Sequence, residues 1–338
     1  MGVAVDGVHV SQTDVAASNG VIHAIDGVLL PPIELPAVDP LGVTGDIIGA
    51  GSSTVGPLTQ NAIEAFINAG YSGSITNDII GSGAGFERFC TAGETDISNA
   101  SRAIKSSEVE ACAALTPARV PFEMYVGIDA LTVVVSVQND FVDDLSVAQL
   151  SAIFSGAATT WDQVDPSFPA EQIQAFAPGS DSGTYDFFLE ATLEASTDNG
   201  GLGLEGDAAE AAIQSVPGIQ FSEDDNVLVQ GVEGSPYAIG FFGYAYYVEN
   251  QSLLKALSVN GVAPTGPTAE SGEYPLARPL FVYSDGDILA AKPQVADFLN
   301  FYLTDLRSFY TGAAQYFPTA ERTYRLAKLL LLTHYPMM

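Results

Sequence analysis

Short apolar segments alternate with helical patterns along most of the chain. The segment at 46–50 (DIIGA) has the composition of a buried strand, and Leu58, Ile63 and Phe66 follow it at helical spacing. Similar pairs recur at 74–82 before Phe86 and Phe89, at 130–137 before 147–154, and at 173–178 before 184–193. A strand and turn at 234–250, a strand at 274–284 and a helix at 292–305 follow. This alternation is typical of the α/β class, in which helices cover a mostly parallel sheet.

The two ends of the chain have different patterns. Residues 3–32 alternate apolar and polar positions around the turn signal SNG at 18–20, which predicts a pair of strands too small to be stable alone. Residues 33–43 contain two prolines and have the composition of a linker. Residues 326–338 are apolar but too short to cross a bilayer, so we expect a terminal helix packed on the body of the protein.

Three short runs place glycine beside hydroxyl residues at expected strand-to-helix transitions. They are GAGSST at 49–54, GSGAG at 81–85 and PGSDSGT at 178–184. The first turn of a helix has unpaired backbone N–H groups and the positive end of the helix dipole, which together hold a small oxyanion. In open α/β sheets the carboxyl ends of the strands are also where ligands bind. The runs therefore predict an anion site.

The net charge decides how such an anion would be held. The 338 residues include 41 acidic and 11 basic ones, a formal charge of −30, and 47% are apolar. This composition predicts a folded chain of two or three domains. It argues against nucleic acid and anionic lipid surfaces as partners, because proteins bind both of these mainly through Lys and Arg. Any bound anion must then be captured by local donors.

The two cysteines, Cys90 and Cys112, lie 22 residues apart. Neither has a second cysteine or a histidine at the spacing of a zinc site. We favour a disulfide, and hence an oxidising compartment, over two buried free thiols.

An ordered series of motifs over residues 46–325 resembles the phosphate-binding proteins of ABC-type phosphate importers. The motifs are IIGAGSSTVGPL, IIGSGAGFERF, TDISNASRAI, LTVVV with LSAIFSGAATTW, PGSDSGTYDFF and YAIGFFGYAYY. The resemblance covers about four fifths of the chain and implies a two-lobed periplasmic-binding-protein-like fold, in which a ligand is held between lobes joined by two hinge crossovers. Residues 8–32 resemble the last stretch of a fasciclin domain, and we interpret 3–32 as a remnant of one.

The resemblance also assigns hydroxyl and backbone donors. Ser53 and Thr54 match the donors of the first lobe, and Ser82 matches the hydroxyl of the second run. The donors of the other lobe match Ser182, Gly183 and Thr184. For each hydroxyl the alternative is a helix N-cap, a role that Ser and Thr commonly fill.

The charged positions depart from the family pattern, in which a carboxylate ends the ASx motif and an Arg stands a few residues before the SGT run. Here Arg102 ends that motif, in NASR, and Pro178 stands at the position of the Arg. Asp181 directly precedes Ser182, so the two charges have exchanged lobes. A guanidinium can still hold an oxyanion with two parallel N–H bonds. The alternatives are an ion pair of Arg102 with Asp96 or Asp181, and a capping role for Asp181.

We expect Asp181 to select phosphate over sulfate. At neutral pH phosphate keeps a proton that it can donate to a carboxylate, whereas sulfate would leave the carboxylate facing a lone pair. An unpaired buried charge costs a few kcal/mol, about a hundredfold in affinity. Asp96 is the next candidate for the proton acceptor.

The expected domain organisation follows the lobes. Residues 1–43 form the fasciclin-like remnant and linker, 44–130 with 241–327 form lobe I, 131–240 form lobe II, and 328–338 form a C-terminal tail. The crossovers are expected near 128–132 and 236–242.

We expect an extracytoplasmic, monomeric receptor that needs no cofactor or metal, binds inorganic phosphate and delivers it to a membrane ABC permease. Receptors for sulfate, molybdate or a phosphonate, and an extracellular adhesion protein, are the alternatives. A serine hydrolase or phosphatase is disfavoured, because a nucleophilic serine needs a base and the three histidines, His9, His23 and His334, lie in the terminal segments.

Overall fold

The computed structural model describes residues 4–5, 8–180, 182–310, 316–317 and 319–336. The chain divides into two compact units. Unit 1 comprises Met1–Val126, Phe281–Ser308 and Thr319–Met338, and unit 2 comprises Gly127–Leu280 and Phe309–Pro318. Each unit is described by itself below.

Unit 1 contains strands in the order β14-β6-β4-β5, with β14 belonging to it from Phe281 onward. Strand β4 pairs in parallel with both β5 and β6, and β14 is antiparallel to β6. The bounds are β4 Asp46–Gly51, β5 Ser74–Ile79, β6 Ile97–Ala100 and β14 Ala277–Asp285. The strands predicted at 46–50 and 74–82 are therefore confirmed, and the mostly parallel arrangement brings the carboxyl ends of β4 and β6 to the same edge.

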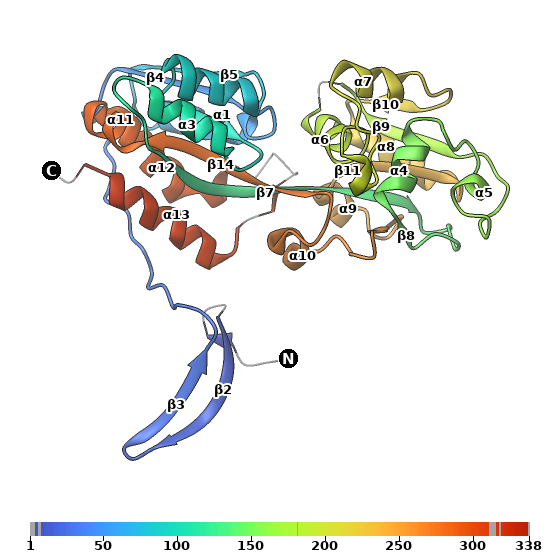
Figure 1. The fold of residues 1–338 in the computed structure, drawn as a ribbon, viewed down its shortest axis with the longest axis horizontal. Coiled ribbons are helices and arrows are strands. Elements are labelled where there is room, and N and C mark those ends of the chain that lie inside the picture. The colour runs from blue at the N-terminus through green and yellow to red at the C-terminus, as the bar shows by residue number, and fades with distance from the viewer. Residues whose placement is uncertain (1–3, 6–7, 181, 311–315, 318, 337–338) are drawn as a thin grey trace. The chain divides into compact units, whose positions relative to one another are not determined.

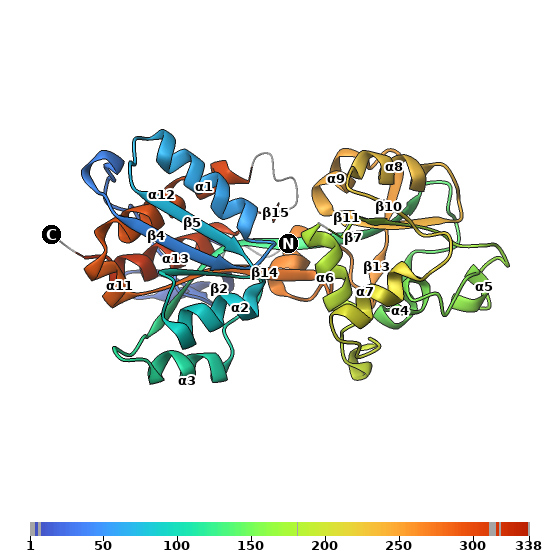
Figure 2. The same ribbon diagram turned by 90° about the horizontal axis from the view of Figure 1, so that it is seen from above.

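Helices cover both faces of this sheet, as Figure 2 shows. On one face the aromatic ring of Phe66 in α1 packs within 5.5 Å of Phe298 and 5.2 Å of Phe301 in α12. On the other face Phe86 and Phe89 pack with Tyr283 of β14. The helices of unit 1 are α1 Gly56–Asn68, α2 Ser82–Phe86, the π-helical η2 Glu87–Ala92, α3 Ser106–Ala114, α11 Gly286–Ala291, α12 Pro293–Phe309 and α13 Glu321–His334.

Cys90 and Cys112 form a disulfide that joins η2 to α3. Both sulfur-bearing residues are buried in the cluster of Phe86, Phe89 and Tyr283. The predicted disulfide is thus confirmed, and it fastens α3 to the layer of helices that follows the second glycine run.

Unit 2 contains strands in the order β10-β9-β11-β7. Strand β9 is parallel to β10 and β11, whereas β7 is antiparallel to β11, and β12 and β15 pair with β7. The bounds are β7 Pro121–Ser136, β8 Asp144–Leu145, β9 Gln174–Pro178, β10 Gln220–Ser222, β11 Ala238–Gly243, β12 Leu254–Ala256, β13 Ser258–Val259 and β15 Tyr316–Phe317. Strand β7 begins nine residues before the predicted position 130, because Phe122, Met124 and Val126 are also buried along it.

The sheet of unit 2 is also covered on both faces (Figure 2). Phe154 of α4 and Phe188 of α6 pack on Phe241 from one side, and Leu228 and Val232 of α8 pack on the other. The helices are α4 Val147–Phe154, α5 Trp161–Val164, α6 Gly183–Ala191, the 3-10 turn η3 Thr197–Asn199, α7 Asp207–Gln214, α8 Asp225–Glu233, α9 Tyr244–Glu249 and α10 Gly266–Ser271. The predicted helix at 147–154 matches α4, which starts with a capping box of Ser146 and Gln149.

The N-terminal residues form a three-stranded sheet of β1 Ala4–Val5, β2 Val8–Ala17 and β3 Gly20–Ile25 (Figure 1). Strands β2 and β3 pair antiparallel around the SNG turn, as predicted. The linker that follows includes η1 Pro40–Gly42 and is held to unit 1 at two points, since Arg325 donates to the Leu30 carbonyl and Asn300 donates to the Pro36 carbonyl.

The division between the units differs from the expected lobe boundaries. Residues 241–280 lie in unit 2, not with 281–327, because β11 and β12 pair with β7, and Tyr274 and Leu276 belong to the same core cluster as Phe154. The expected terminal helix is present, because residues 328–334 belong to helix α13, whose Ala327 and Leu331 are buried. This helix begins at Glu321, before the boundary expected for the C-terminal tail at 328. The last two residues of the expected tail lie outside the described part.

Candidate functional site

The first glycine run joins β4 to α1. Ser52 is buried directly after the strand, and its Oγ accepts hydrogen bonds from the N–H groups of Thr54 at 3.2 Å and Val55 at 3.3 Å. Ser52, which the sequence analysis did not single out, therefore caps this turn. Thr54 is buried, and Ser53 is half-buried.

The second run places Ser82 at the start of α2, after Gly81, which has a φ of 83°. Its Oγ lies 3.1 Å from Ser101 Oγ and accepts the Ser101 N–H at 3.0 Å. Ser101 directly follows β6, so these bonds join the start of α2 to the carboxyl end of that strand. Ser101 is a second residue of this edge that the sequence did not single out.

Arg102 follows Ser101 and forms an ion pair that neither sequence alternative included. Its Nη1 and Nη2 donate to the two carboxylate oxygens of Glu108 at 2.9 and 2.7 Å, and Nη1 also donates to the Ala103 carbonyl. Burial raises the pKa of the Glu108 carboxyl, but the hydrogen bonds from Arg102 and from the Lys105 N–H together lower the pKa by more than burial raises it. The pKa therefore lies below its ordinary value. The guanidinium fork thus faces a carboxylate that stays charged.

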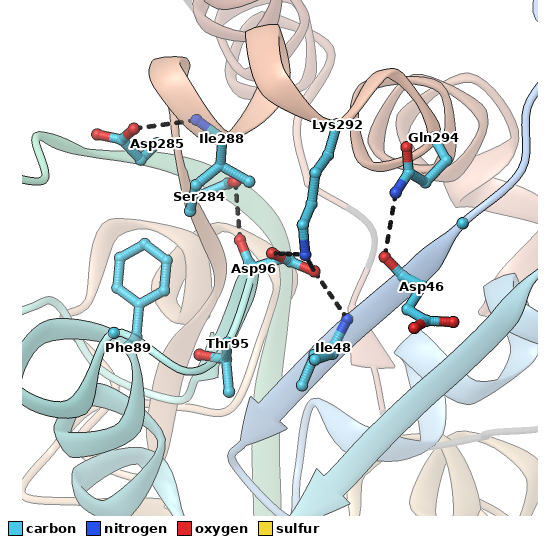
Figure 3. Close-up of polar contacts among 12 residues, drawn as sticks. Asp46, Ile48, Phe89, Thr95, Asp96, Ser284, Asp285, Ile288, Lys292 and Gln294 are labelled. Atoms are coloured by element: carbon cyan, nitrogen blue, oxygen red, sulfur yellow. Dashed lines mark hydrogen bonds and ion pairs between the residues drawn. The ribbon is translucent and has the colours of Figure 1, made fainter. Parts of the chain in front are cut away.

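Asp96, the second candidate for the proton acceptor, has a structural role. Its carboxylate accepts two bonds from Lys292 Nζ, at 2.7 and 2.9 Å, and one from the Ile48 N–H at 3.0 Å, as Figure 3 shows. It directly precedes β6, at the amino end of the strand, whereas Ser101 follows the carboxyl end. Asp96 is therefore wrong as an alternative acceptor, because its oxygens are used at the opposite edge of the sheet.

The third run joins β9 to α6 in unit 2. Ser182 is the N-cap of α6, and its Oγ accepts the Thr184 N–H at 3.3 Å. The Gly183 carbonyl accepts a bond from Arg278 at 3.3 Å. The predicted residue Asp181 lies outside the described residues.

The Thr184 hydroxyl is one of eight buried side-chain polar atoms that have no hydrogen-bond partner among the described residues. The residue is only 2% exposed. A buried polar group without a partner costs roughly 1–3 kcal/mol, so native structures contain few of them. One that lies in the first turn of a helix, after a glycine run, is a candidate donor to a ligand.

Two features are absent from the described part of the chain. It contains no group of three or more His, Cys, Asp or Glu side chains that could hold a metal ion. None of its helices is both long and apolar enough to traverse a bilayer.

Comparison with known proteins shows which family models the chain matches and which proteins are similar to it. Residues 38–305 match the model of the PBP superfamily domain, and residues 1–31 match that of the fasciclin domain. Protein SphX of Synechococcus elongatus is 43% identical over 292 residues, covering 83% of this chain and 79% of the relative. The phosphate-binding protein PstS of Staphylococcus saprophyticus is 36% identical over 267 residues, covering 77% and 76%.

A solved structure is also similar. The crystal structure of a possible phosphate binding protein from Planctomyces limnophilus has a TM-score of 0.76 and 34% sequence identity, and the alignment covers 87% of this chain and 100% of that one.

Proposed function

Because the chain belongs to the PBP superfamily, we propose that it captures inorganic phosphate and delivers it to an ABC permease. The fold class predicted from the sequence, a two-lobed periplasmic-binding-protein-like α/β fold, is confirmed. The fasciclin match at the N-terminus also agrees with the predicted remnant. The observation that carries the proposal is the buried Thr184 hydroxyl, which lies without a described partner in the first turn of α6.

The proposed ligand groups are those that the family resemblance assigns. They are Ser53, Thr54, Ser82, Arg102, Asp181, Ser182, Gly183 and Thr184. Backbone N–H groups and hydroxyls at helix starts supply most of the donors, and this suits a chain whose formal charge is −30. Arg102 would have to share its guanidinium between Glu108 and the anion, which its five N–H donors allow.

The proposal also covers the compartment in which the protein acts and the way in which it acts. A disulfide between Cys90 and Cys112 supports an oxidising, extracytoplasmic compartment. We propose that the protein acts there as a monomeric receptor and not as an enzyme. The relatives named as phosphate-binding proteins support this role.

The direct test is titration calorimetry on protein freed of bound anion. We expect phosphate to bind more tightly than sulfate or molybdate. Since the donors are mostly neutral, we also expect the phosphate affinity to change less than about threefold between 0.05 and 0.2 M salt. A site that relied on attraction by a basic patch would lose more affinity, because salt screens that attraction. Tighter binding of sulfate or molybdate would assign the protein to another oxyanion, and binding of none of the three would refute the proposal.

The role of Asp181 can be tested with one substitution. Asp181→Asn should narrow the preference for phosphate over sulfate by about tenfold or more, because an amide can donate to the oxygen that a carboxylate repels. Asp186→Asn is the matched control: Asp186 is an exposed carboxylate in the first turn of α6 and is not a proposed ligand. An unchanged preference in the Asp181 variant would exclude this residue as the proton acceptor.

A further inference from the structure

Arg278 is a buried arginine that contacts the helix of the third glycine run. It lies in β14, and only 7% of its surface is exposed. Arginine is rarely buried unless its charge is paired and its N–H groups are bonded. Its partners therefore show what the side chain holds in place.

Three of these partners lie along one face of α6. Arg278 Nη2 donates to the Gly183 carbonyl at 3.3 Å, the guanidinium lies 4.0 Å from the centre of the Phe187 ring, and Nη1 donates to Glu190 Oε2 at 2.6 Å. Positions 183, 187 and 190 are four and three residues apart, the spacing that places side chains on the same side of a helix. One arginine thus contacts α6 from its first turn to its last.

The opposite side of the guanidinium is fixed by β7. Arg278 Nε donates to Asp129 Oδ2 at 3.0 Å, and Asp129 is 1% exposed. Burial raises the pKa of the Asp129 carboxyl, and the charge of Arg278 opposes that rise. Asp129 also pairs in register with Tyr316 of β15.

These residues occupy particular places in the chain. Unit 2 consists of two chain segments, Gly127–Leu280 and Phe309–Pro318. Asp129, Arg278 and Tyr316 each lie two residues from one of these boundaries. The arginine therefore joins α6 to the segments in which the chain passes from one unit to the other.

The bond to Gly183 acts on a proposed ligand donor through the covalent structure. The Gly183 carbonyl and the Thr184 N–H belong to one peptide group, which is planar and trans. A donor that fixes the direction of this carbonyl also fixes the direction of the N–H, and with it the first turn that carries the Thr184 hydroxyl.

We infer that Arg278 is a positioning residue for phosphate binding: with Asp129 behind it, it holds the first turn of α6 so that the Gly183–Thr184 peptide and the Thr184 hydroxyl are oriented for the anion. This inference rests on the proposed function. The inference assigns Arg278 no contact with the ligand. Arg278 should therefore act by keeping helix α6 ordered in the phosphate-free protein.

The test compares Arg278→Met with Arg119→Met. Arg119 is a matched control in unit 1, because its guanidinium donates to the carbonyls of Phe89, Gly93 and Thr95 and lies 4.8 Å from the Phe89 ring. Both substitutions remove a guanidinium that binds at least one backbone carbonyl and lies over an aromatic ring, but only Arg278 contacts α6.

Two measurements are made on each variant. Hydrogen exchange in phosphate-free buffer should show the amides of 183–191 exchanging about tenfold faster in Arg278→Met than in wild type, and unchanged in Arg119→Met. Calorimetry should show phosphate affinity reduced about tenfold in Arg278→Met only. Arg278→Lys should keep part of the stability but not the affinity, because an ammonium cannot reach several partners in a fixed fork.

A milder second variant keeps the inference testable if Arg278→Met does not fold. Should Arg278→Met fail to fold, Glu190→Gln removes a single contact from a side chain that is 54% exposed, and it should shift both measurements in the same direction by a smaller factor. If wild type binds no phosphate, the proposed function fails while the exchange measurement still tests Arg278. If wild type binds and the Arg278 and Glu190 variants match it in affinity and exchange, the inference is overturned.

Discussion

Thr184→Val should stabilise the phosphate-free protein and weaken phosphate binding. Valine has nearly the shape of threonine and removes a hydroxyl that is buried without a described partner. Removing the cost of that unpaired group should raise the free energy of unfolding by about 1 kcal/mol. If the same hydroxyl donates to phosphate, its loss should lower the affinity by roughly tenfold to a hundredfold, the worth of a hydrogen bond to a charged group.

The opposite signs of the two effects make this prediction specific. Urea unfolding in phosphate-free buffer gives the stability, and calorimetry gives the affinity. Thr132→Val is the matched control, since Thr132 in β7 is also fully buried with no described partner for its hydroxyl and is not a proposed ligand. The control should gain stability at unchanged affinity. A Thr184→Val protein that binds phosphate as tightly as wild type would remove the hydroxyl from the ligand set.

The sequence predicted the local elements well where a strong pattern met a clear turn signal. Strand β4 and helix α4 have the predicted bounds within one residue, and the N-terminal hairpin turns at SNG. These features depend on residues that are close in the chain, where periodicity and capping act.

The lobe boundaries could not be obtained in the same way. Strands β12 and β13 have three and two residues, too few to show a period, and β12 is placed by pairing with β7, more than a hundred residues earlier. The assignment of 241–280 to the wrong lobe follows from that, because a short strand's partner is decided by tertiary packing and not by its own pattern.

For the site, the sequence predicted where strands give way to helices but not the hydrogen bonds of the turns between them. Ser52, one position before the assigned pair, accepts the N–H groups of Thr54 and Val55 in the turn that precedes α1. The partner of Arg102 is Glu108, six residues on across a turn, and the partner of Arg278 is 149 residues away. Neither pairing leaves a spacing signal that reasoning from one sequence could detect.

Two of the three glycines in the second glycine run, Gly83 and Gly85, have different physical roles. A Cβ built on Gly85 would lie 2.6 Å from the Gly51 Cα and 3.2 Å from the Ala50 carbonyl oxygen, so α2 and the end of β4 touch backbone to backbone. A Cβ on Gly83, two residues earlier in the same helix, would meet only Arg102 Nη2, at 4.0 Å. The run GSGAG therefore serves close packing at Gly85, in addition to the anion binding proposed for Ser82.

This difference predicts opposite results for two conservative substitutions in one helix. Gly85→Ala should lower the free energy of unfolding by about 3 kcal/mol, because a methyl group forced against backbone atoms must displace the helix or the strand. Gly83→Ala should change it by less than about 1 kcal/mol, in the stabilising direction, because alanine restricts the unfolded chain and favours the helix. Urea unfolding of both variants in the same phosphate-free buffer measures this. Equal stability of the two would mean that the contact between Gly85 and Gly51 does not limit the residue at 85, and the glycines of this run would then be explained by the ligand alone.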